Sequence, residues 1–261
     1  MLLVGHGTRS EQGKEEFLRV GGLVAAAAPI PVEPAFLEFC QPTIGQAVGR
    51  LVEQDVQSMV VAPLLLFAAG HAKDDVPAAV AESLSKFGVA TDVTVAMAPH
   101  LGCHPAIVEL SARRYAEAVK HYDAVPASQT CLVLIGRGSH DESALAEMHE
   151  FARLRAAMTP AAEVHVAFLA MAQPSWRDGL ALVSAGNWRR IVVQPHLLFH
   201  GDLYERLVAG VADLARMAAG SQWIATEYLA GHGDEASIAT TVLARAVAAV
   251  PIRVVAPGSD R

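Results

Sequence analysis

Cysteine is scarce in this 261-residue chain, with three residues that are widely separated in sequence. Cys40, Cys103 and Cys131 form no CxxC pair, the spacing that binds structural zinc or an iron–sulfur cluster. We interpret all three as buried free thiols. The sequence therefore argues against a cysteine-bound metal centre.

Long apolar runs and a basic charge excess are also missing. Charged residues and prolines interrupt every candidate for the roughly 20 apolar residues that a membrane span needs. The start of the chain has no basic region followed by an apolar one, so we expect a cytoplasmic protein that is not bound to a membrane. The net charge of −7 argues against nucleic acid as a partner, although a local basic pocket could still bind an anionic small molecule.

Apolar residues are abundant, at 52% of the chain, and three apolar segments occur twice. LVGHGT (3–8) resembles LIGRGS (134–139) at an offset of 131 residues, and AFLEFCQPT (35–43) resembles AFLAMAQPS (167–175) at an offset of 132. VVAPLLLF (60–67) resembles VVQPHLLF (192–199), again at 132. The nearly constant offset predicts two homologous domains, 1–124 and 130–261, joined by a polar linker at 123–129.

Each half alternates short apolar runs with amphipathic segments, which is typical of an α/β fold with a parallel sheet covered by helices. The sequence thus predicts two tandem βαβα domains. Strands are expected at 2–4, 32–38, 58–66 and 91–97 in the first half and at 131–135, 163–169, 190–195 and 222–227 in the second. Helices of the first half are expected near 10–26, 42–54, 74–86 and 104–120. Pro42 and Pro77 mark expected helix starts, because proline is tolerated best in the first turn.

Reactive side chains follow the first three predicted strands. His6 lies in GHGTR after the first strand, Glu38 ends the second, and His71 follows the third. Ligands of such sheets bind at the carboxyl ends of the strands. A histidine beside glycines is often only a turn residue, but two histidines and a carboxylate at one sheet edge favour divalent metal binding or proton transfer near neutral pH.

The second half offers an internal comparison. Residues of the first half and their counterparts are His6 and Arg137, Glu38 and Ala170, and His71 and Leu203. Residues needed only by the fold should recur in both copies, as the glycines and the apolar strands do. The comparison predicts an active centre in the first half alone, while the role of the nearby His196 and His200 stays open.

The surroundings of the two histidines fit this chemistry. Gly5 and Gly7 would let the backbone approach a flat ligand and leave the imidazole of His6 uncrowded. His71 precedes the helix expected near Pro77, whose positive N-terminal end disfavours imidazolium. A neutral imidazole is the form that binds metal and accepts protons.

The segments LLVGHGTRS, VEPAFLEFCQPTI, VVAPLLLFAAGHAKDDVP and APHLGCHPAIVEL resemble the sirohydrochlorin chelatases, which insert cobalt or ferrous iron into sirohydrochlorin for cobalamin or sirohaem synthesis. The resemblance covers essentially the whole chain, in the fused two-copy form of the family. It implies a chelatase fold with the tetrapyrrole bound in a cleft between the halves, a divalent metal as substrate and no tightly bound cofactor. His6 and His71 resemble the metal-binding and proton-accepting histidines of the family, and Glu38 resembles its acidic residue.

The substrate is rich in carboxylates, so cations should surround it. Arg9, Lys73 and Arg137 are the candidates, because each lies in a predicted strand-end loop. Imidazole and carboxylate accept both Fe²⁺ and Co²⁺. The resemblance favours iron, because the chain lacks the accessory metal-binding tracts of some cobalt-inserting relatives. A fused pair of domains should suffice as a monomer.

Other functions remain as alternatives. A non-catalytic carrier would bind the tetrapyrrole or the metal without speeding insertion. A histidine phosphatase would need an arginine directly before its nucleophilic histidine, where this chain has Gly5. A nucleotide-binding protein would need a G-x-G-x-x-G or Walker lysine motif after a strand, and none occurs.

Overall fold

The computed structural model describes residues 1–67, 70–89, 93–218 and 220–252, and for residues 70–73 it gives only the backbone. Strands and helices alternate along the chain, so the predicted α/β class is confirmed. The chain divides into two compact units. Unit 1 comprises Met1–Gly102 and the chain from Glu235 onward, and unit 2 comprises Cys103–Asp234.

Unit 1 is built on a five-stranded sheet in the order β2-β1-β3-β4-β9. The first four strands run parallel, and β9 pairs antiparallel with β4. Its strands are β1 (Leu2–Gly5), β2 (Glu33–Phe36), β3 (Ser58–Pro63), β4 (Thr94–Met97) and β9 (Val250–Ile252), and its helices are α1 (Glu11–Ala27), α2 (Ile44–Val52), α3 (Gly70–Lys86) and α8 (Glu235–Val247). Every residue of β1 is buried, as expected for a central parallel strand covered on both faces.

Unit 2 is built on a four-stranded parallel sheet in the order β6-β5-β7-β8. Its strands are β5 (Thr130–Gly136), β6 (Glu163–Phe168), β7 (Arg190–Pro195) and β8 (Gln222–Ala225), its α-helices are α4 (Pro105–Val119), α5 (Glu142–Ala156), α6 (Trp176–Ser184) and α7 (Asp202–Met217), and two short 3₁₀ helices cover Ala127–Gln129 and Gly231–Gly233. The strand order of β6, β5, β7 and β8 repeats that of β2, β1, β3 and β4, which fits two homologous halves.

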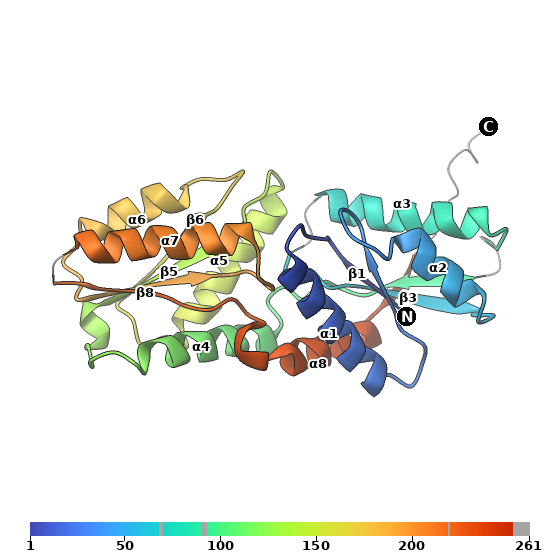
Figure 1. Ribbon diagram of the computed structural model, residues 1–261, viewed down its shortest axis with the longest axis horizontal. Helices are drawn as coiled ribbons and strands as arrows, with labels where there is room; N and C mark the ends of the chain where they lie inside the picture. The colour runs from blue at the N-terminus through green and yellow to red at the C-terminus, as the bar shows by residue number, and fades with distance from the viewer. Residues whose placement is uncertain (68–69, 90–92, 219, 253–261) are drawn as a thin grey trace. The chain divides into compact units, whose positions relative to one another are not determined.

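The two compact units divide the chain differently from the two predicted sequence repeats. The ranges 1–124 and 130–261 assign α4 to the first half and α8 to the second, whereas α4 belongs to unit 2 and α8 to unit 1. Helix α4 packs against α5 and β8, and α8 packs against β3 and lies beside α1 (Figure 1). The expected linker at 123–129 consequently lies inside unit 2.

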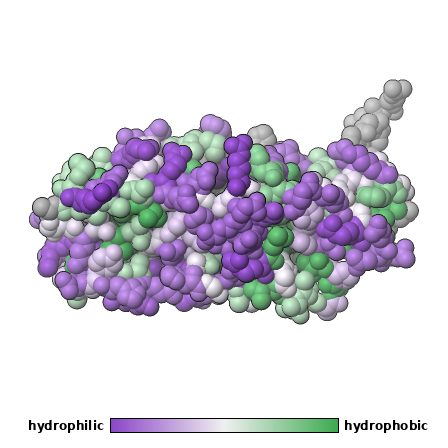
Figure 2. Space-filling model, viewed as in Figure 1, coloured by the Kyte–Doolittle hydropathy of each residue, from purple (hydrophilic) through white to green (hydrophobic). Residues whose placement is uncertain are grey.

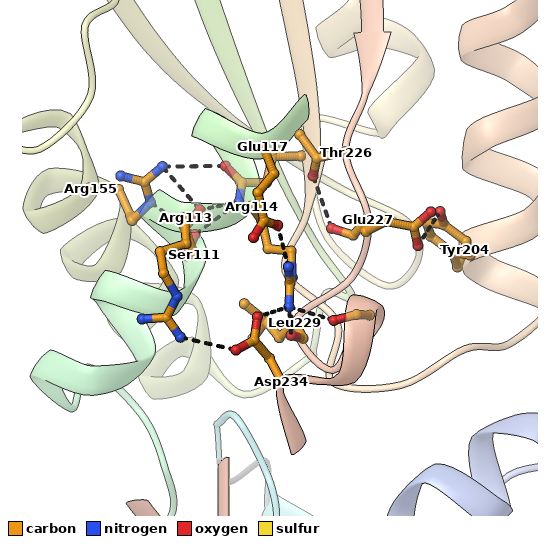
Figure 3. Close-up of polar contacts among 12 residues, drawn as sticks. Ser111, Arg113, Arg114, Glu117, Arg155, Tyr204, Thr226, Glu227, Leu229 and Asp234 are labelled. Carbon is orange, nitrogen blue, oxygen red and sulfur yellow. Dashed lines mark hydrogen bonds and ion pairs between the residues drawn. The ribbon is translucent and has the colours of Figure 1, made fainter. Parts of the chain in front are cut away.

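Buried polar contacts hold α4 in unit 2. The guanidinium of Arg114 is fully buried, donates to the backbone carbonyls of Leu229 and Gly231, and pairs with Asp234 and Glu117 (Figure 3). Glu117 lies on α4 itself, whereas Leu229, Gly231 and Asp234 lie after β8, on the segment that leads into α8. An apolar helix face can pack on either of two similar sheets, but a buried guanidinium needs its specific acceptors. Arg114 therefore fixes which sheet α4 covers.

A second buried arginine joins α4, α5 and β7. The guanidinium of Arg155 donates to Oγ of Ser111 at 2.8 Å, to Oγ1 of Thr159 at 2.7 Å and to Oε1 of Gln194 at 3.3 Å. Burial lowers the pKa of Arg155 to about 10, so it remains a cation at neutral pH. Its neutral partners accept from the buried N–H donors, which offsets part of the cost of burying this charge.

Helix α3 begins earlier than predicted. It starts at Gly70, so Pro77 lies inside the helix and not at its start. Val76, Val80 and Leu84 recur at one-turn spacing and are all buried in the core, and this packing sustains the helix through the proline. Pro42 also lies outside its expected place, since α2 begins at Ile44 after the N-cap Thr43.

The last features of the fold are the burial of the cysteines and the polarity of the surface. Cys131 is buried, which raises its pKa to about 12, but Cys40 and Cys103 are only half-buried, contrary to prediction, and none of the three forms a disulfide. On the face shown in Figure 2, polar residues predominate and apolar residues form separate small patches. Among the described residues, no helix is both long and apolar enough to span a membrane.

Candidate functional site

The loop after β1 places His6 at the carboxyl end of the first sheet, beside the loop after β2. The backbone N–H of Leu37 donates to the carbonyl of Gly5, and that of Glu38 donates to the carbonyl of His6, each at 2.9 Å. Strand β2 ends at Phe36, earlier than predicted, so these bonds extend the pairing of the two strands into their loops. They bring Glu38 next to His6, as the sequence predicts. The Glu38 side chain is exposed and His6 is half-buried.

The two glycines that flank His6 are explained by contacts within the chain. Gly7 has φ +100°, and a Cβ at this position would lie 1.8 Å from the carbonyl oxygen of Glu38. A Cβ on Gly5 would lie 2.5 Å from the ring of Phe17, which packs on Phe36. Glycine is therefore required at both positions for the close approach of these neighbours.

Cys40 ties the two loops together a second time. Its thiol donates to the carbonyl of Thr8 at 2.9 Å and accepts from the Thr8 N–H at 3.5 Å. Helix α1 begins just beyond, where the Ser10 side chain caps it by accepting from the N–H of Gly13. The GHGTR segment is thus fixed at both ends, which limits the positions that His6 can adopt.

Phe39 and Arg9 form the exposed rim of this site. The Phe39 ring lies 6.4 Å from the His6 ring, centroid to centroid, with 13° between their planes. The guanidinium carbon of Arg9 lies 5.2 Å from the centroid of Phe39, within the range of a cation–π contact. Sequence reasoning singled out Arg9 and overlooked Phe39. The usable signal was the large apolar residue, Phe39 or Met171, that follows the Glu38 position in both repeats.

The remaining predicted residues of the first half lie on α3. His71 and Lys73 are in its first turn, directly after the segment that follows β3. Their side chains lie outside the described residues. Within the described part of the chain, no three histidine, cysteine or acidic side chains gather in a metal-binding arrangement. Metal binding by His6 and His71 therefore stays a prediction.

Unit 2 repeats the backbone of this site with different side chains. The N–H of Leu169 donates to Gly136 and that of Ala170 to Arg137, each at 2.9 Å, as at the equivalent positions of unit 1. Gly138 has φ +89°, and a Cβ there would lie 1.7 Å from the Ala170 carbonyl oxygen. Arg137 is exposed where unit 1 has His6. The loop scaffold is therefore independent of which side chains occupy the His6 and Glu38 positions.

His196 and His200 of unit 2, whose roles the sequence leaves open, lie in different surroundings. His196 is 3% exposed and lies against the ring of Phe151, with centroids 4.0 Å apart. Burial, assisted by the charge of Arg155, lowers the pKa of His196 to about 3, so the imidazole is neutral. A side chain enclosed in this way belongs to the core, and the first repeat has the buried Leu64 at this position.

His200 belongs to an aromatic cluster at the carboxyl end of the second sheet. Its ring meets those of Tyr204 and Tyr228 edge to face, with centroids 5.7 and 5.9 Å away. The Tyr204 hydroxyl donates to Glu227 at 2.9 Å (Figure 3), and burial raises the pKa of Tyr204. His200 also lies 3.5 Å from a carboxylate oxygen of Glu205. The cluster anchors the start of α7 to the end of β8.

Comparison with known proteins adds independent evidence. A sequence model of the CbiX family matches residues 1–118 and 131–249, one match for each repeat. A sirohydrochlorin ferrochelatase of Priestia megaterium is 30% identical over 241 residues, covering 91% of this chain and 86% of the relative. A sirohydrochlorin cobaltochelatase of the same organism is 30% identical over 207 residues, covering 79% and 66%. The solved structure described as SirB from Bacillus subtilis with Fe³⁺ is similar with a TM-score of 0.79 at 27% identity, covering 94% of this chain and 92% of that one.

Proposed function

Because the chain belongs to the CbiX family, we propose that it is a metal chelatase that inserts Fe²⁺ or Co²⁺ into sirohydrochlorin. One observation within the chain supports the proposal most strongly. The loops around His6 and Arg137 share their backbone hydrogen bonds and their required glycines, yet only the first has an imidazole at the His6 position and a carboxylate at the Glu38 position. Unit 2 has Arg137 and Ala170 at these two positions, so the shared fold does not require the two groups that would serve metal insertion.

Metal insertion requires a partly dehydrated metal ion and the removal of two pyrrole protons. In the proposed mechanism, His6 and His71 bind the metal, and one of them accepts the protons with assistance from Glu38. The hydrogen bond from the Glu38 backbone N–H to the His6 carbonyl holds the two residues at adjacent positions of the site. No covalent intermediate is needed, because the metal replaces the protons directly.

Substrate binding is assigned to cations at the strand ends. Arg9, Lys73 and Arg137 would each pair with carboxylates of sirohydrochlorin, and arginine does so with two parallel hydrogen bonds. Gly5 and Gly7 would let the macrocycle approach the loop backbone, although their internal neighbours already require glycine. Removal of any one cation should raise KM for the tetrapyrrole with little change in kcat, because it acts in binding.

Anaerobic spectrophotometry tests the function directly. Purified protein is mixed with sirohydrochlorin and Fe²⁺ or Co²⁺, and the absorbance change on insertion is followed against the uncatalysed rate. We expect acceleration with at least one metal, and the ratio of kcat/KM values ranks the two. A matched control is His121→Ala, which removes an exposed histidine beyond α4 and should leave the rate unchanged. Binding of sirohydrochlorin without acceleration would instead identify a carrier.

The proposal extends to the setting of the enzyme. We place it in sirohaem or cobalamin synthesis, in the cytoplasm, acting as a monomer because one chain already contains both repeats. Light scattering of the purified protein at working concentration tests the monomer. A mass of twice 27.5 kDa would contradict it.

A further inference from the structure

Phe39 combines two unfavourable features. Its side chain is 61% exposed, and its backbone has φ +62°, a left-handed conformation that is unusual for a bulky residue. The N–H of Cys40 donates to the carbonyl of Glu38 at 2.7 Å, which closes a three-residue turn with Phe39 at its centre. Such turns are rare and strained, and strain of this kind concentrates at ligand sites.

Both neighbours of Phe39 are fixed to the loop that carries His6. The N–H of Glu38 donates to His6 at 2.9 Å, and the thiol of Cys40 donates to Thr8 at 2.9 Å. The residue between these anchors cannot turn inward without breaking one of them. The ring is therefore held at the solvent side of the site although it contributes little to the core.

The orientation of the ring indicates what it meets. Its plane is within 13° of the His6 plane, and the Arg9 guanidinium lies 5.2 Å from its centroid. A flat conjugated ligand with anionic groups at its edge matches this row of aromatic ring, imidazole and guanidinium.

The second repeat keeps an exposed apolar residue at the same place. Met171 has φ +60° and is 45% exposed, although Arg137 and Ala170 have replaced the reactive residues before it. Both repeats thus keep an exposed apolar side chain at this position, whatever residues stand at the His6 and Glu38 positions. Only the first repeat has an aromatic ring there, beside the imidazole.

We infer that Phe39 packs against the face of the tetrapyrrole macrocycle beside His6 and holds Arg9 in position for a carboxylate at its edge. The inference rests on the chelatase function proposed above and adds a substrate-binding residue to it. Phe39 acts on the macrocycle and not on the metal. Its removal should therefore weaken binding of metal-free sirohydrochlorin and raise KM for it, with little change in kcat.

Fluorescence titration of metal-free sirohydrochlorin against the full chain tests this. We expect Phe39→Gly to raise Kd about tenfold, the scale of a lost stacking contact, while Phe39→Trp stays close to wild type. Glycine fits φ +62°, so the Tm of Phe39→Gly should be unchanged or higher. Asp55→Gly is the matched control, because Asp55 also has a positive φ, at +53°. Asp55 lies between α2 and β3, at the opposite end of the strands from His6. The Asp55→Gly substitution should therefore leave Kd unchanged.

The contact with Arg9 is tested by a double-mutant cycle. If Phe39 holds Arg9 in place, Arg9→Ala should cost less binding in the Phe39→Gly background than in the wild type. Fully additive losses would overturn the positioning of Arg9. Unchanged Kd in Phe39→Gly, with a wild type that inserts metal, would overturn the packing role itself. If the wild type neither binds sirohydrochlorin nor inserts metal, the proposed function fails, and the Phe39 inference, which rests on it, fails with it.

Discussion

The carbonyl oxygen of Glu38 lies 1.8 Å from the position that a Cβ on Gly7 would occupy. Every residue other than glycine would therefore clash with Glu38 at position 7. The two loops of the candidate site are thus in direct backbone contact. The same relation joins Gly138 to Ala170, at 1.7 Å. In each unit, one glycine sets the spacing between the loops after the first two strands.

Gly7→Ala should therefore destabilise the protein and disable the site. The new methyl group must displace Glu38, and the backbone at φ +100° is strained for alanine, so we expect a loss of about 3 kcal/mol or more in unfolding free energy. Chemical denaturation measures the loss. Gly22→Ala is the control, because a Cβ there has no neighbour within 4 Å and alanine favours the helix. Equal stability of the two variants would contradict the packing described.

Replacement of a site residue by its counterpart from the second repeat should abolish metal insertion without affecting the fold. His6→Arg places in unit 1 the residue that the matching loop of unit 2 already accommodates, so the fold should be retained. We expect the insertion rate to fall at least about 100-fold, because the variant loses a metal ligand and proton acceptor. The reverse change, Arg137→His, should create no second active centre. A His6→Arg enzyme with near-normal turnover would show that His6 is not catalytic.

Glu38→Ala tests the assisting carboxylate in the same way. Unit 2 has Ala170 at this position with the same backbone hydrogen bonds, so stability should change by less than about 1 kcal/mol. We expect kcat to fall about tenfold, because the carboxylate would no longer assist the transfer of pyrrole protons. Stopped-flow absorbance measures the rate of insertion. An unaltered kcat would remove Glu38 from the proton path.

The buried His196 should make the protein sensitive to acid. Its pKa is about 3 in the folded protein and near 6.5 when unfolded, so below pH 6.5 the unfolded chain binds a proton that the folded chain does not. Stability is therefore complete above that pH and falls, by up to about 1.4 kcal/mol per pH unit, as the pH decreases toward 3. His196→Leu copies Leu64 of the first repeat and should flatten the dependence between pH 4 and 6.5 without changing turnover. Parallel stability curves for the two proteins would contradict this.

Arg114 and Arg113 offer a matched pair on one helix. Arg114→Ala leaves the buried carbonyls of Leu229 and Gly231 without their donor, and we expect a loss of about 3–5 kcal/mol in unfolding free energy. Arg113 is 45% exposed and its guanidinium lies 3.4 Å from a carboxylate oxygen of Asp234, so Arg113→Ala should cost less than about 1 kcal/mol. Urea denaturation compares them. Similar losses would show that the buried bonds do not hold α4.

Much of the fold follows from local patterns. Apolar runs such as Leu2–Gly5 and Thr130–Gly136 are buried strands, as predicted, and the repeated glycines correctly indicated equivalent loops. The proximity of Glu38 to His6 was also predictable, because neighbouring parallel strands end at the same sheet edge. These features depend on residues close in sequence or on a general rule of sheet topology.

Other features depend on partners that no local pattern identifies. The apolar faces of α4 and α8 do not reveal which of two similar sheets each helix covers. The acceptors of Arg114 lie more than 100 residues away in sequence, at Leu229 and Asp234. The exposed position of Phe39 arises from hydrogen bonds on either side of it, which composition and periodicity do not report. These long-range contacts determine which unit each helix belongs to and where the Phe39 ring lies.

The exchange of α4 and α8 has a consequence for synthesis of the chain. Unit 2 is one continuous segment, whereas unit 1 receives α8 and β9 only when residues 235–252 have been made. On the ribosome, the unit that contains His6 is thus begun first and completed last. A chain that stops after Asp234 would contain every proposed catalytic residue, yet its site would rest on a sheet that lacks one of its helices, α8, and its edge strand, β9.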